Sequence, residues 1–546
     1  MAIQVRIESR ECEAEPGLSL FECADLLGLP ITNSCGQQGT CRECLIEVTE
    51  GSDLLAPLSE EERHLSGDFR LACRARIRGQ SGRIRFRRLR RGDLQILDAG
   101  AELPALRRAA PFNPAVAREG NTVLLDGDPI AQAGGPLHGL ALDVGTMTVV
   151  ARLVDLEAGS VRATQAFENP QAFAGSDVMA RIAYDGTDSE NTLRATLIAY
   201  VNHTIEAFPC DPKTIYEVTV AGNPTMRDLF FGLDVGSLGR SPFRSLTEHE
   251  FTAGQRTSTS LVAAARQLGL LTHPRARAYG LPLVGSHVGA DAAACLLAID
   301  AANEDGLIAL MDIGTNTELL IGNRRRMLAA SCPAGPAFEG GGIACGMPAF
   351  PGAIEAVRLD GTDAPLCRVI GGREALGICG SGLVDALGEL LRTGRMNRLG
   401  RIGAERFVLD PGQDIYLSEE DIGRLAQAKG AHAAGWTLVM KRYGADYTDI
   451  DRLYLAGGFA NRLDPHAALR IGLIPDLPRE RVRQVGNAAI EGATLALRSL
   501  TLRRELDPFV KTIEHVELEA DEGFFDAFVE GCQFKPLSAP PQREQS

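Results

Sequence analysis

The chain has 546 residues, of which 45% are hydrophobic and 23% are charged, and its formal net charge is −15. This composition is typical of a globular protein with several domains and excludes a collagen-like fibre, a long disordered chain and a disulfide-rich miniprotein. The acidic charge argues against a nucleic-acid scaffold, while the lack of a long apolar run or a signal-peptide pattern predicts a cytoplasmic protein that does not enter the membrane.

The charge divides the chain into two parts. Residues 1–92 contain 14 arginines, no lysine and 14 acidic residues, so the whole negative charge belongs to the remainder. Two modules of different charge, and therefore of different origin, are expected.

Four of the 13 cysteines, Cys35, Cys41, Cys44 and Cys73, form a pattern in the first part. Three lie within ten residues, and the glycines between them permit turns that direct backbone amides toward sulfur. A zinc site usually pairs its cysteines as two CxxC knuckles, whereas a triplet with a distant fourth cysteine is typical of a 2Fe–2S cluster. Buried thiols without a ligand role are the remaining alternative.

The surroundings of these cysteines predict a small α+β domain. Residues 3–8 alternate as a strand, residues 18–27 have the pattern of a short helix, and residues 45–48 follow the cysteine loop as a strand. Residues 1–92 therefore resemble the adrenodoxin-like ferredoxins, which implies a β-grasp fold with the four cysteines as ligands.

Residues 83–91 contain six arginines. They could form the last ferredoxin strand with a solvated outer face, or a docking patch for an acidic partner or for the acidic remainder of this chain. Residues 93–138 lose the regular pattern and contain several prolines and glycines, which predicts a linker or a reduced middle subdomain.

The second part contains an internal repeat. Asp143-Val-Gly-Thr-Met-Thr148 matches Asp312-Ile-Gly-Thr-Asn-Thr317, and an apolar strand precedes each copy. Each is predicted to be a β-hairpin whose glycine lets a phosphate oxygen approach, whose threonines donate to it and whose aspartate suits Mg²⁺. The candidate residues are Asp143, Gly145, Thr146, Thr148, Asp312, Gly314, Thr315, Asn316 and Thr317.

A third motif, an apolar strand ending in Gly457-Gly458, can let adenosine lie against the backbone. Together the three motifs resemble the actin, sugar-kinase and heat-shock-chaperone ATPases. The resemblance implies an α/β duplicated ATPase domain at 139–535, with lobes at about 139–300 and 306–535, connecting helices at 285–291 and 377–385, and a disordered tail at 536–546.

Other residues of this part fit the nucleotide site less sharply. Glu318 could orient an attacking water, unless strand alternation turns it outward. Glu339, with Gly340 and Gly341, could meet a ribose hydroxyl, or the segment could be a tight surface turn. The segment 222–226, which follows an apolar strand, could face the cleft, and His287 and Asp291 are expected to be packing and hinge residues.

The whole chain resembles the reductive activators of corrinoid proteins. The resemblance implies ATP-dependent, one-electron reduction of Co(II) to Co(I) in a corrinoid methyl-transfer protein, with a 2Fe–2S cluster, ATP and Mg²⁺ as cofactors and an upstream electron donor. The stretch between the two parts is short, as if an extra middle domain were reduced or missing, which leaves a homodimer open. The alternatives are an ATP-driven activator of another low-potential enzyme and a redox-sensing nucleotide switch.

Overall fold

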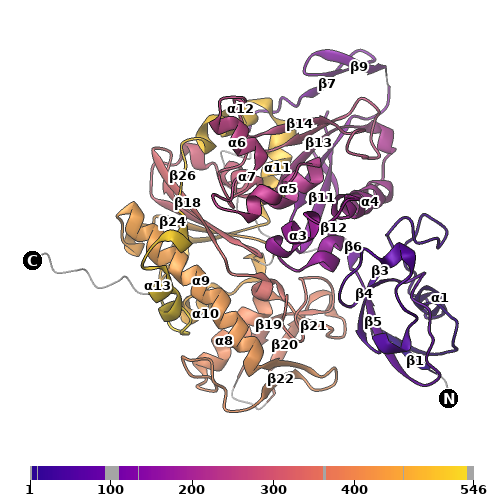
Figure 1. Ribbon diagram of the computed structural model, residues 1–546. Helices are drawn as coiled ribbons and strands as arrows, with labels where there is room; N and C mark the ends of the chain where they lie inside the picture. Colours follow the sequence, from indigo (N-terminus) through magenta and orange to yellow (C-terminus); the bar gives the residue numbers. More distant parts are fainter. Residues whose placement is uncertain are drawn as a thin grey trace, which may run out of the picture.

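The computed structural model describes residues 3–8, 10–92, 110–132, 134–360, 364–458 and 460–537. A small N-terminal domain lies beside the larger two-lobed part of the chain, near strand β12 and helices α3 and α4 of the first lobe (Figure 1). The predicted tail falls outside the described residues from position 538 onward. No helix in the described ranges is long and apolar enough to cross a membrane.

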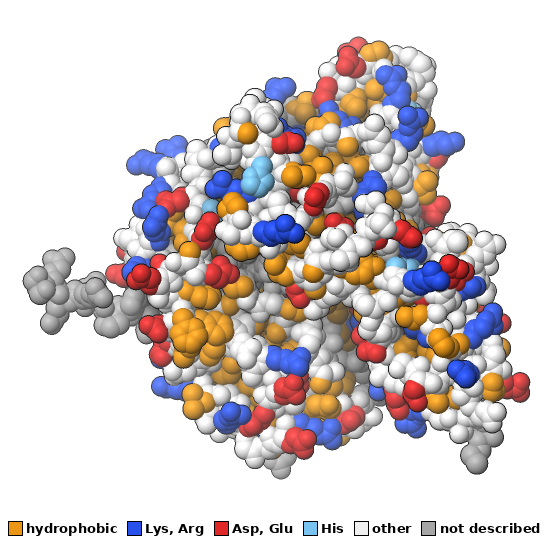
Figure 2. Space-filling view, viewed as in Figure 1, with side chains coloured by type: hydrophobic (Ala, Val, Ile, Leu, Met, Phe, Trp, Pro, Cys, Tyr) orange, Lys and Arg blue, Asp and Glu red, His pale blue; other side chains and the backbone are white. Residues whose placement is uncertain are grey.

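The N-terminal domain is a mixed five-stranded sheet with one helix. Its strand order is β2-β1-β5-β3-β4, in which β1 and β5 run parallel and the other neighbours antiparallel. Its elements are β1 (Ile3–Ile7), β2 (Arg10–Ala14), α1 (Leu20–Leu26), β3 (Leu45–Glu50), β4 (Phe69–Leu71) and β5 (Gly82–Arg88). Basic and acidic side chains are interspersed on its visible face, as the balanced charge of residues 1–92 requires (Figure 2).

Residues 110–132 form a small antiparallel sheet. It consists of β7 (Val116–Glu119), β8 (Thr122–Leu125) and β9 (Asp128–Gln132). Asn113 anchors its start, because its side chain bonds the hydroxyls of Ser499 and Thr501. The prolines and glycines of this stretch therefore belong, in its described part, to a folded element; residues 93–109 lie outside the described ranges.

The first lobe is built on a seven-stranded sheet with the order β14-β15-β13-β10-β11-β12-β6. Its strands are β6 (Arg91–Gly92), β10 (His138–Val144), β11 (Thr148–Asp155), β12 (Val161–Glu168), β13 (Ile215–Gly222), β14 (Leu261–Ala264) and β15 (Arg277–Gly280). Its helices are α3 (Val178–Asp185), α4 (Thr192–Ala207), α5 (Pro224–Phe231), α6 (Leu246–Thr252) and α7 (Ala290–Ala298).

The second lobe repeats this topology on a six-stranded sheet with the order β25-β24-β16-β17-β18-β26. In the first lobe, β10, β11 and β12 form an antiparallel meander with β13 parallel to β10; in the second, β16, β17 and β18 do so with β24 parallel to β16. The strands are β16 (Ile308–Ile313), β17 (Thr317–Asn323), β18 (Arg326–Cys332), β24 (Arg452–Ala456), β25 (Val482–Gly486) and β26 (Glu514–His515).

Most of the remaining elements of the second half cover this sheet and extend the second lobe, whereas α11 and α12 pack on the first lobe. They are β19 (Ala353–Arg358), β20 (Leu366–Val369), β21 (Gly377–Ile378), α8 (Gly380–Arg392), β22 (Arg406–Asp410), β23 (Ile415–Ser418), α9 (Glu419–Tyr443), α10 (Pro465–Ile471), α11 (Ala488–Arg498), α12 (Leu500–Val510) and α13 (Phe524–Gly531).

The helices that cross between the lobes are α7 and α11. They approach so closely that a Cβ on Gly492 would lie 1.9 Å from the carbonyl oxygen of Ala294. The predicted connecting segments differ from this arrangement: residues 285–289 are a loop before α7, and α8 packs on β19 and α10 inside the second lobe. Small residues occur in both predicted segments and in α7 and α11, so their presence in the sequence could not show which helices cross between the lobes.

Helix α11 returns to the first lobe although it lies near the end of the chain. Its carbonyl at Ala493 accepts a hydrogen bond from the hydroxyl of Thr219 on β13, at 2.9 Å. On the following helix α12, Arg503 donates to the buried carboxylate of Glu217, with N–O distances of 2.9 and 2.7 Å. The sequence boundary drawn at residues 300–306 therefore does not separate the lobes in space.

Candidate functional site: a thiol cluster and an interlobe cleft

The four patterned cysteines lie as two pairs. The sulfurs of Cys44 and Cys73 are 3.4 Å apart and buried, while Cys35 interacts with Cys41 and both remain partly exposed. Gly36 and Gly39 between them have φ values of 62° and 80°, which a side chain would disfavour. The turns at these two glycines therefore bring Cys35 and Cys41 together. Cys73, the fourth cysteine, follows strand β4 and lies beside Cys44.

The pairing fits a 2Fe–2S cluster, because each of two irons can take two thiolates. Burial opposes ionisation of Cys35, but backbone amides of Cys41 and Thr40 outweigh it and lower the pKa of this thiol to about 6. Contact with Cys44 lowers the pKa of Cys73. Among the described residues, no three His, Cys, Asp or Glu side chains are grouped closely enough to hold a single metal ion.

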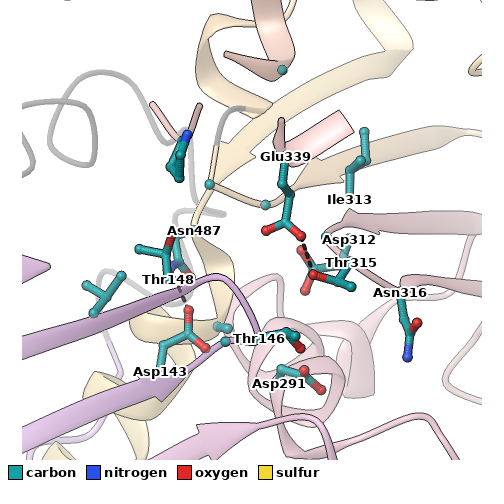
Figure 3. A pocket seen from close by; sticks show the side chains of 18 of the residues that line it. Asp143, Thr146, Thr148, Asp291, Asp312, Ile313, Thr315, Asn316, Glu339 and Asn487 are labelled. Carbon is teal, nitrogen blue, oxygen red and sulfur yellow. Dashed lines mark hydrogen bonds between the residues drawn. The ribbon is translucent and has the colours of Figure 1, made fainter. Parts of the chain in front are cut away.

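The two repeated hairpin tips face each other across a cleft between the lobes. Figure 3 shows Asp143 and Thr146 on one side and Asp312, Thr315 and Glu339 on the other. The first tip is tightly closed, since the amide of Gly145 donates to the carbonyl of Thr148 at 3.1 Å and a Cβ on Gly145 would lie 2.6 Å from that oxygen. A glycine is therefore required where the prediction placed a phosphate.

Most of the predicted nucleotide residues border this cleft. Of the candidates, those that line it are Asp143, Gly145, Thr146, Thr148, Asp312, Gly314, Thr315, Asn316, Glu318, Glu339, Gly457 and Gly458. Gly457 has a φ of 118°, and a Cβ there would lie 2.3 Å from the carbonyl oxygen of Ile313, so the glycine loop packs directly against the second tip.

Three predicted residues do not line the cleft. Thr317 is fully buried beside Glu318, and the alternation of β17 directs only Glu318 to the cleft, so the alternative that Glu318 faces outward is wrong.

Gly340 and Gly341 follow the turn that carries Glu339; a Cβ on Gly340 would lie 2.4 Å from the backbone nitrogen of Met347. These glycines shape the turn, and of the three residues 339–341 it is Glu339 that lines the cleft.

Sequence reasoning missed Asn487 and undervalued Asp291. Asn487 caps α11, accepting from the amide of Ile490, and its Nδ2 donates to Asp143 Oδ2 at 2.7 Å. Asp291, expected to be a packing residue, lies in the cleft at the start of α7. Of the segment 222–226 that could face the cleft, Asn223 lines it and donates to the hydroxyl of Thr146 at 3.0 Å. The only local sequence feature that could have drawn attention to Asn487 is its position between a strand and a helix, where it caps the helix.

Five carboxylates, of which Glu318 is buried and the other four are half-buried, give the cleft its electrostatic character. Burial raises the pKa of Asp143 to about 7, of Asp312 to about 6 and of Glu339 to about 7. Burial, reinforced by the charge of Asp312, raises the pKa of Asp291 to about 8, and burial also raises the pKa of Glu318. No lysine or arginine is among the described residues that line the cleft. Asp143 and Asp312 offer carboxylate oxygens, and Mg²⁺ usually takes only one or two carboxylates and keeps several water ligands, so this pair suits it.

The arginine run divides between its two predicted roles. Arg83 and Arg85 are exposed on β5, as a solvated strand face requires. Arg87 and Arg90 instead pair with Glu168 of the first lobe, with N–O distances of 2.7 and 3.9 Å. Part of the run thus docks on the acidic remainder of the same chain.

We expect the raised carboxylate pKa values to make the stability of the nucleotide-free protein fall as pH rises. The folded chain holds protons on Asp143 and Asp291 up to about pH 7 and 8, whereas these groups lose them near pH 4 when unfolded, so their favourable contribution is present at low pH and is lost through pH 7–8. The unfolding midpoint of the ATPase part should fall by about 5 °C between pH 6 and pH 8.5.

Thermal scans of the wild type and Asp291→Asn over this range test the expectation. The variant should have a flatter pH dependence, and equal slopes for the two proteins would contradict an ionisable carboxylate buried at this position.

Comparison with known families gives three matches. Residues 3–78 match the 2Fe–2S iron-sulfur cluster binding domain, residues 138–304 the RACo middle region, and residues 306–542 the C-terminal domain of RACo, the ASKHA domain. These matches confirm the ferredoxin-type domain and the actin and sugar-kinase-like part. The family's middle region covers the first lobe of this chain.

Relatives of known role match most of the chain. The corrinoid activation enzyme RamQ of Eubacterium limosum is 28% identical over 94% of this chain and 95% of its own length. A Co(II) methylated amine-specific corrinoid protein reductase of Methanosarcina barkeri is 26% identical over 71% of this chain and 75% of its own. The solved structure of a reductive activator for corrinoid, iron-sulfur protein matches with a TM-score of 0.72 and 26% identity over 98% of both chains.

The two RACo matches are contiguous but for one residue and run from residue 138 to residue 542, and the solved activator superposes over nearly the whole length. The chain belongs to the RACo family of corrinoid reductive activators.

Proposed function

We propose that this chain couples ATP hydrolysis to the one-electron reduction of a corrinoid protein's cobalt from Co(II) to Co(I). The observation that carries the proposal is the presence, in one chain, of two thiol pairs suited to a 2Fe–2S cluster and a carboxylate-lined cleft suited to a magnesium nucleotide. The relatives named above are corrinoid activators and reductases, which supports the choice of acceptor.

The thiol pairs hold the electron carrier. Cys35, Cys41, Cys44 and Cys73 are the ligands, and a cluster bound there supplies one-electron transfer. The electron comes from a low-potential donor outside this chain and ends on the cobalt. For a one-electron step roughly 7 kcal/mol of coupled free energy covers an uphill gap of about 300 mV, which explains why a nucleotide site accompanies the carrier.

The cleft residues bind and orient the nucleotide. Asp143 and Asp312 are placed to hold Mg²⁺ or its water shell, and Asn487 fixes the orientation of Asp143. The tips around Thr146 and Thr315 lie where phosphate oxygens can accept from hydroxyls and amides, while Gly457 and Gly458 leave room for adenosine.

Water attack on the terminal phosphate requires a base in the cleft. Asp291 and Glu318 both border it, and burial raises the pKa of Asp291 to about 8, near neutrality, where a carboxylate can take a proton from water and later release it. The chemical balance is ATP and water to ADP and phosphate, with the electron moving separately.

The test is an anaerobic assay with a Co(II) corrinoid protein, MgATP and a one-electron reductant, followed by visible spectroscopy. We expect conversion to Co(I) that depends on ATP and is absent with ADP. ATP-dependent reduction of other acceptors but never of the corrinoid would support an activator of another enzyme. ATP turnover that a corrinoid protein fails to stimulate would support a nucleotide switch.

A further inference from the structure

The ferredoxin-type domain is held on the first lobe by residues 168–184, which we call the docking segment. Ser66 donates its hydroxyl to the carbonyl of Phe173, and Tyr184 donates to the carbonyl of His64 at 2.6 Å. The rings of His64 and Phe173 meet edge to face, with centroids 5.6 Å apart. These contacts lie on the short helix Pro170–Ala174 and on α3.

A charged contact begins the docking segment. Glu168, whose side chain is 7% exposed, pairs with Arg87 at 2.7 Å and lies 3.9 Å from Arg90. Because Glu168 is largely withdrawn from water while Arg87 is partly exposed, separation of the pair leaves a buried carboxylate without its cation, so the contact depends on the position of Glu168.

The docking segment also contacts the backbone of the first hairpin tip, residues 143–148. Asn169 donates its side-chain nitrogen to the carbonyl of Gly145 and its backbone amide to that of Met147, both at 2.8 Å. The fully buried guanidinium of Arg181 donates to the carbonyl of Thr146 at 2.7 Å. One short segment therefore contacts the nucleotide tip on one side and the electron-carrier domain on the other.

Arg181 joins the first tip to the part of the docking segment that contacts the ferredoxin-type domain. Besides the tip, it donates to Gln171 Oε1 and to the carbonyl of Gly175, both at 3.2 Å, so it fastens the short helix to the tip. No described carboxylate lies within ion-pair distance of its guanidinium. A phosphate group at the tip would attract this cation and draw it away from Gln171 and Gly175.

In the docked arrangement the thiol loop faces its own first lobe. Arg42 pairs with Glu190 at 3.4 Å, and Tyr200 donates to the carbonyl of Glu43 at 3.2 Å. Cys41 lines a cavity of about 350 Å³ together with Ala199 of α4. Of the partly exposed thiol pair, Cys41 is thus turned toward α4.

The second lobe meets the ferredoxin-type domain across a separate gap. Phe350 lines the nucleotide cleft and also a cavity of about 300 Å³ whose opposite wall contains Leu89 and Arg88. Closure of the lobes on a nucleotide would move this shared wall, since the two spaces have Phe350 in common.

From this geometry we propose that the docking segment is a nucleotide-controlled latch: a bound magnesium nucleotide pulls Arg181 and Asn169 toward the first tip and releases the ferredoxin-type domain from the first lobe. The inference rests on the proposed function, because it assumes that the cleft binds a nucleotide. Released, the thiol loop can present Cys41 to the corrinoid protein; docked, Cys41 faces α4.

Hydrogen–deuterium exchange of the full-length protein with its cluster intact, with and without a non-hydrolysable magnesium ATP analogue, tests the latch. We expect the analogue to slow exchange in residues 143–148 and to speed exchange about tenfold in residues 60–68 and 169–175. Unchanged or slower exchange in both of the latter regions, with 143–148 protected, would overturn the latch and leave nucleotide binding intact. Lack of protection in 143–148 would instead overturn the nucleotide site on which both proposals depend.

Tyr184→Phe tests the docking contact itself. Without nucleotide it should speed exchange of residues 60–68 about fivefold, because it removes the hydrogen bond to His64, and the analogue should then add less. Tyr416→Phe is the matched control, because Tyr416 contacts Arg406 on the hairpin of β22 and β23. Equal exchange in the two variants would contradict a latch at Tyr184.

Discussion

Replacement of Cys41 by serine is expected to abolish electron transfer while the nucleotide site stays functional. Cys41 belongs to the partly exposed thiol pair, and a serine hydroxyl is a much weaker ligand for iron than a thiolate. The purified variant should lose the visible absorption of a 2Fe–2S cluster, and corrinoid reduction should fall by at least about 100-fold. Nucleotide binding should be unchanged, because the cleft draws on residues from position 143 onward.

Cys12→Ser is the matched control for this variant. Cys12 is in the same domain and also partly exposed, but it lies on β2, outside the ligand spacing. It should keep the cluster spectrum and the activity. A cluster that survives Cys41→Ser with unchanged iron content would contradict the ligand assignment.

The second large effect is expected for Asp312→Asn. The substitution keeps the size of the side chain but removes a charge from the carboxylate group that faces the metal position, and loss of one such stabilising group costs about 100- to 1,000-fold in turnover. ATP hydrolysis should fall by this factor, and ATP-dependent corrinoid reduction should fall with it. The spectrum of the cluster should be that of the wild type.

Asp305→Asn provides the comparison, because Asp305 lies in the same lobe with a side chain that is 67% exposed. Its hydrolysis rate should match the wild type. If Asp312→Asn hydrolyses ATP normally, the metal position proposed between Asp143 and Asp312 is wrong.

The sequence allowed prediction of those features that depend on residues close together in the chain. The cysteine triplet and the two Asp-x-Gly-Thr tips are local patterns, and each specifies its own turn, so their positions followed from spacing alone. The duplicated topology followed from the repeat, and the family matches confirm the two folds.

What could not be predicted depends on contacts between distant segments. Asn487 reaches Asp143 only because α11 returns to the first lobe, and no pattern near residue 487 records that path. Likewise, the arginines at 83–91 look equivalent in sequence; the fold alone separates exposed Arg85 from Arg87, which pairs with Glu168. Thr317 and Glu318 were both candidates, and only the pleat of β17 decided between them.

The return of α11 and α12 to the first lobe has a consequence for biosynthesis. The core of that lobe includes Leu497 against Gly139 and the buried pair of Arg503 with Glu217, so it needs residues from the last tenth of the chain. Because a ribosome delivers the N-terminal residues first, β10 and β13 must wait without their covering helix until translation is nearly finished. The ferredoxin-type domain, whose sheet is complete by residue 88, can fold long before. The ferredoxin-type domain can therefore fold before the first lobe of the ATPase part is complete.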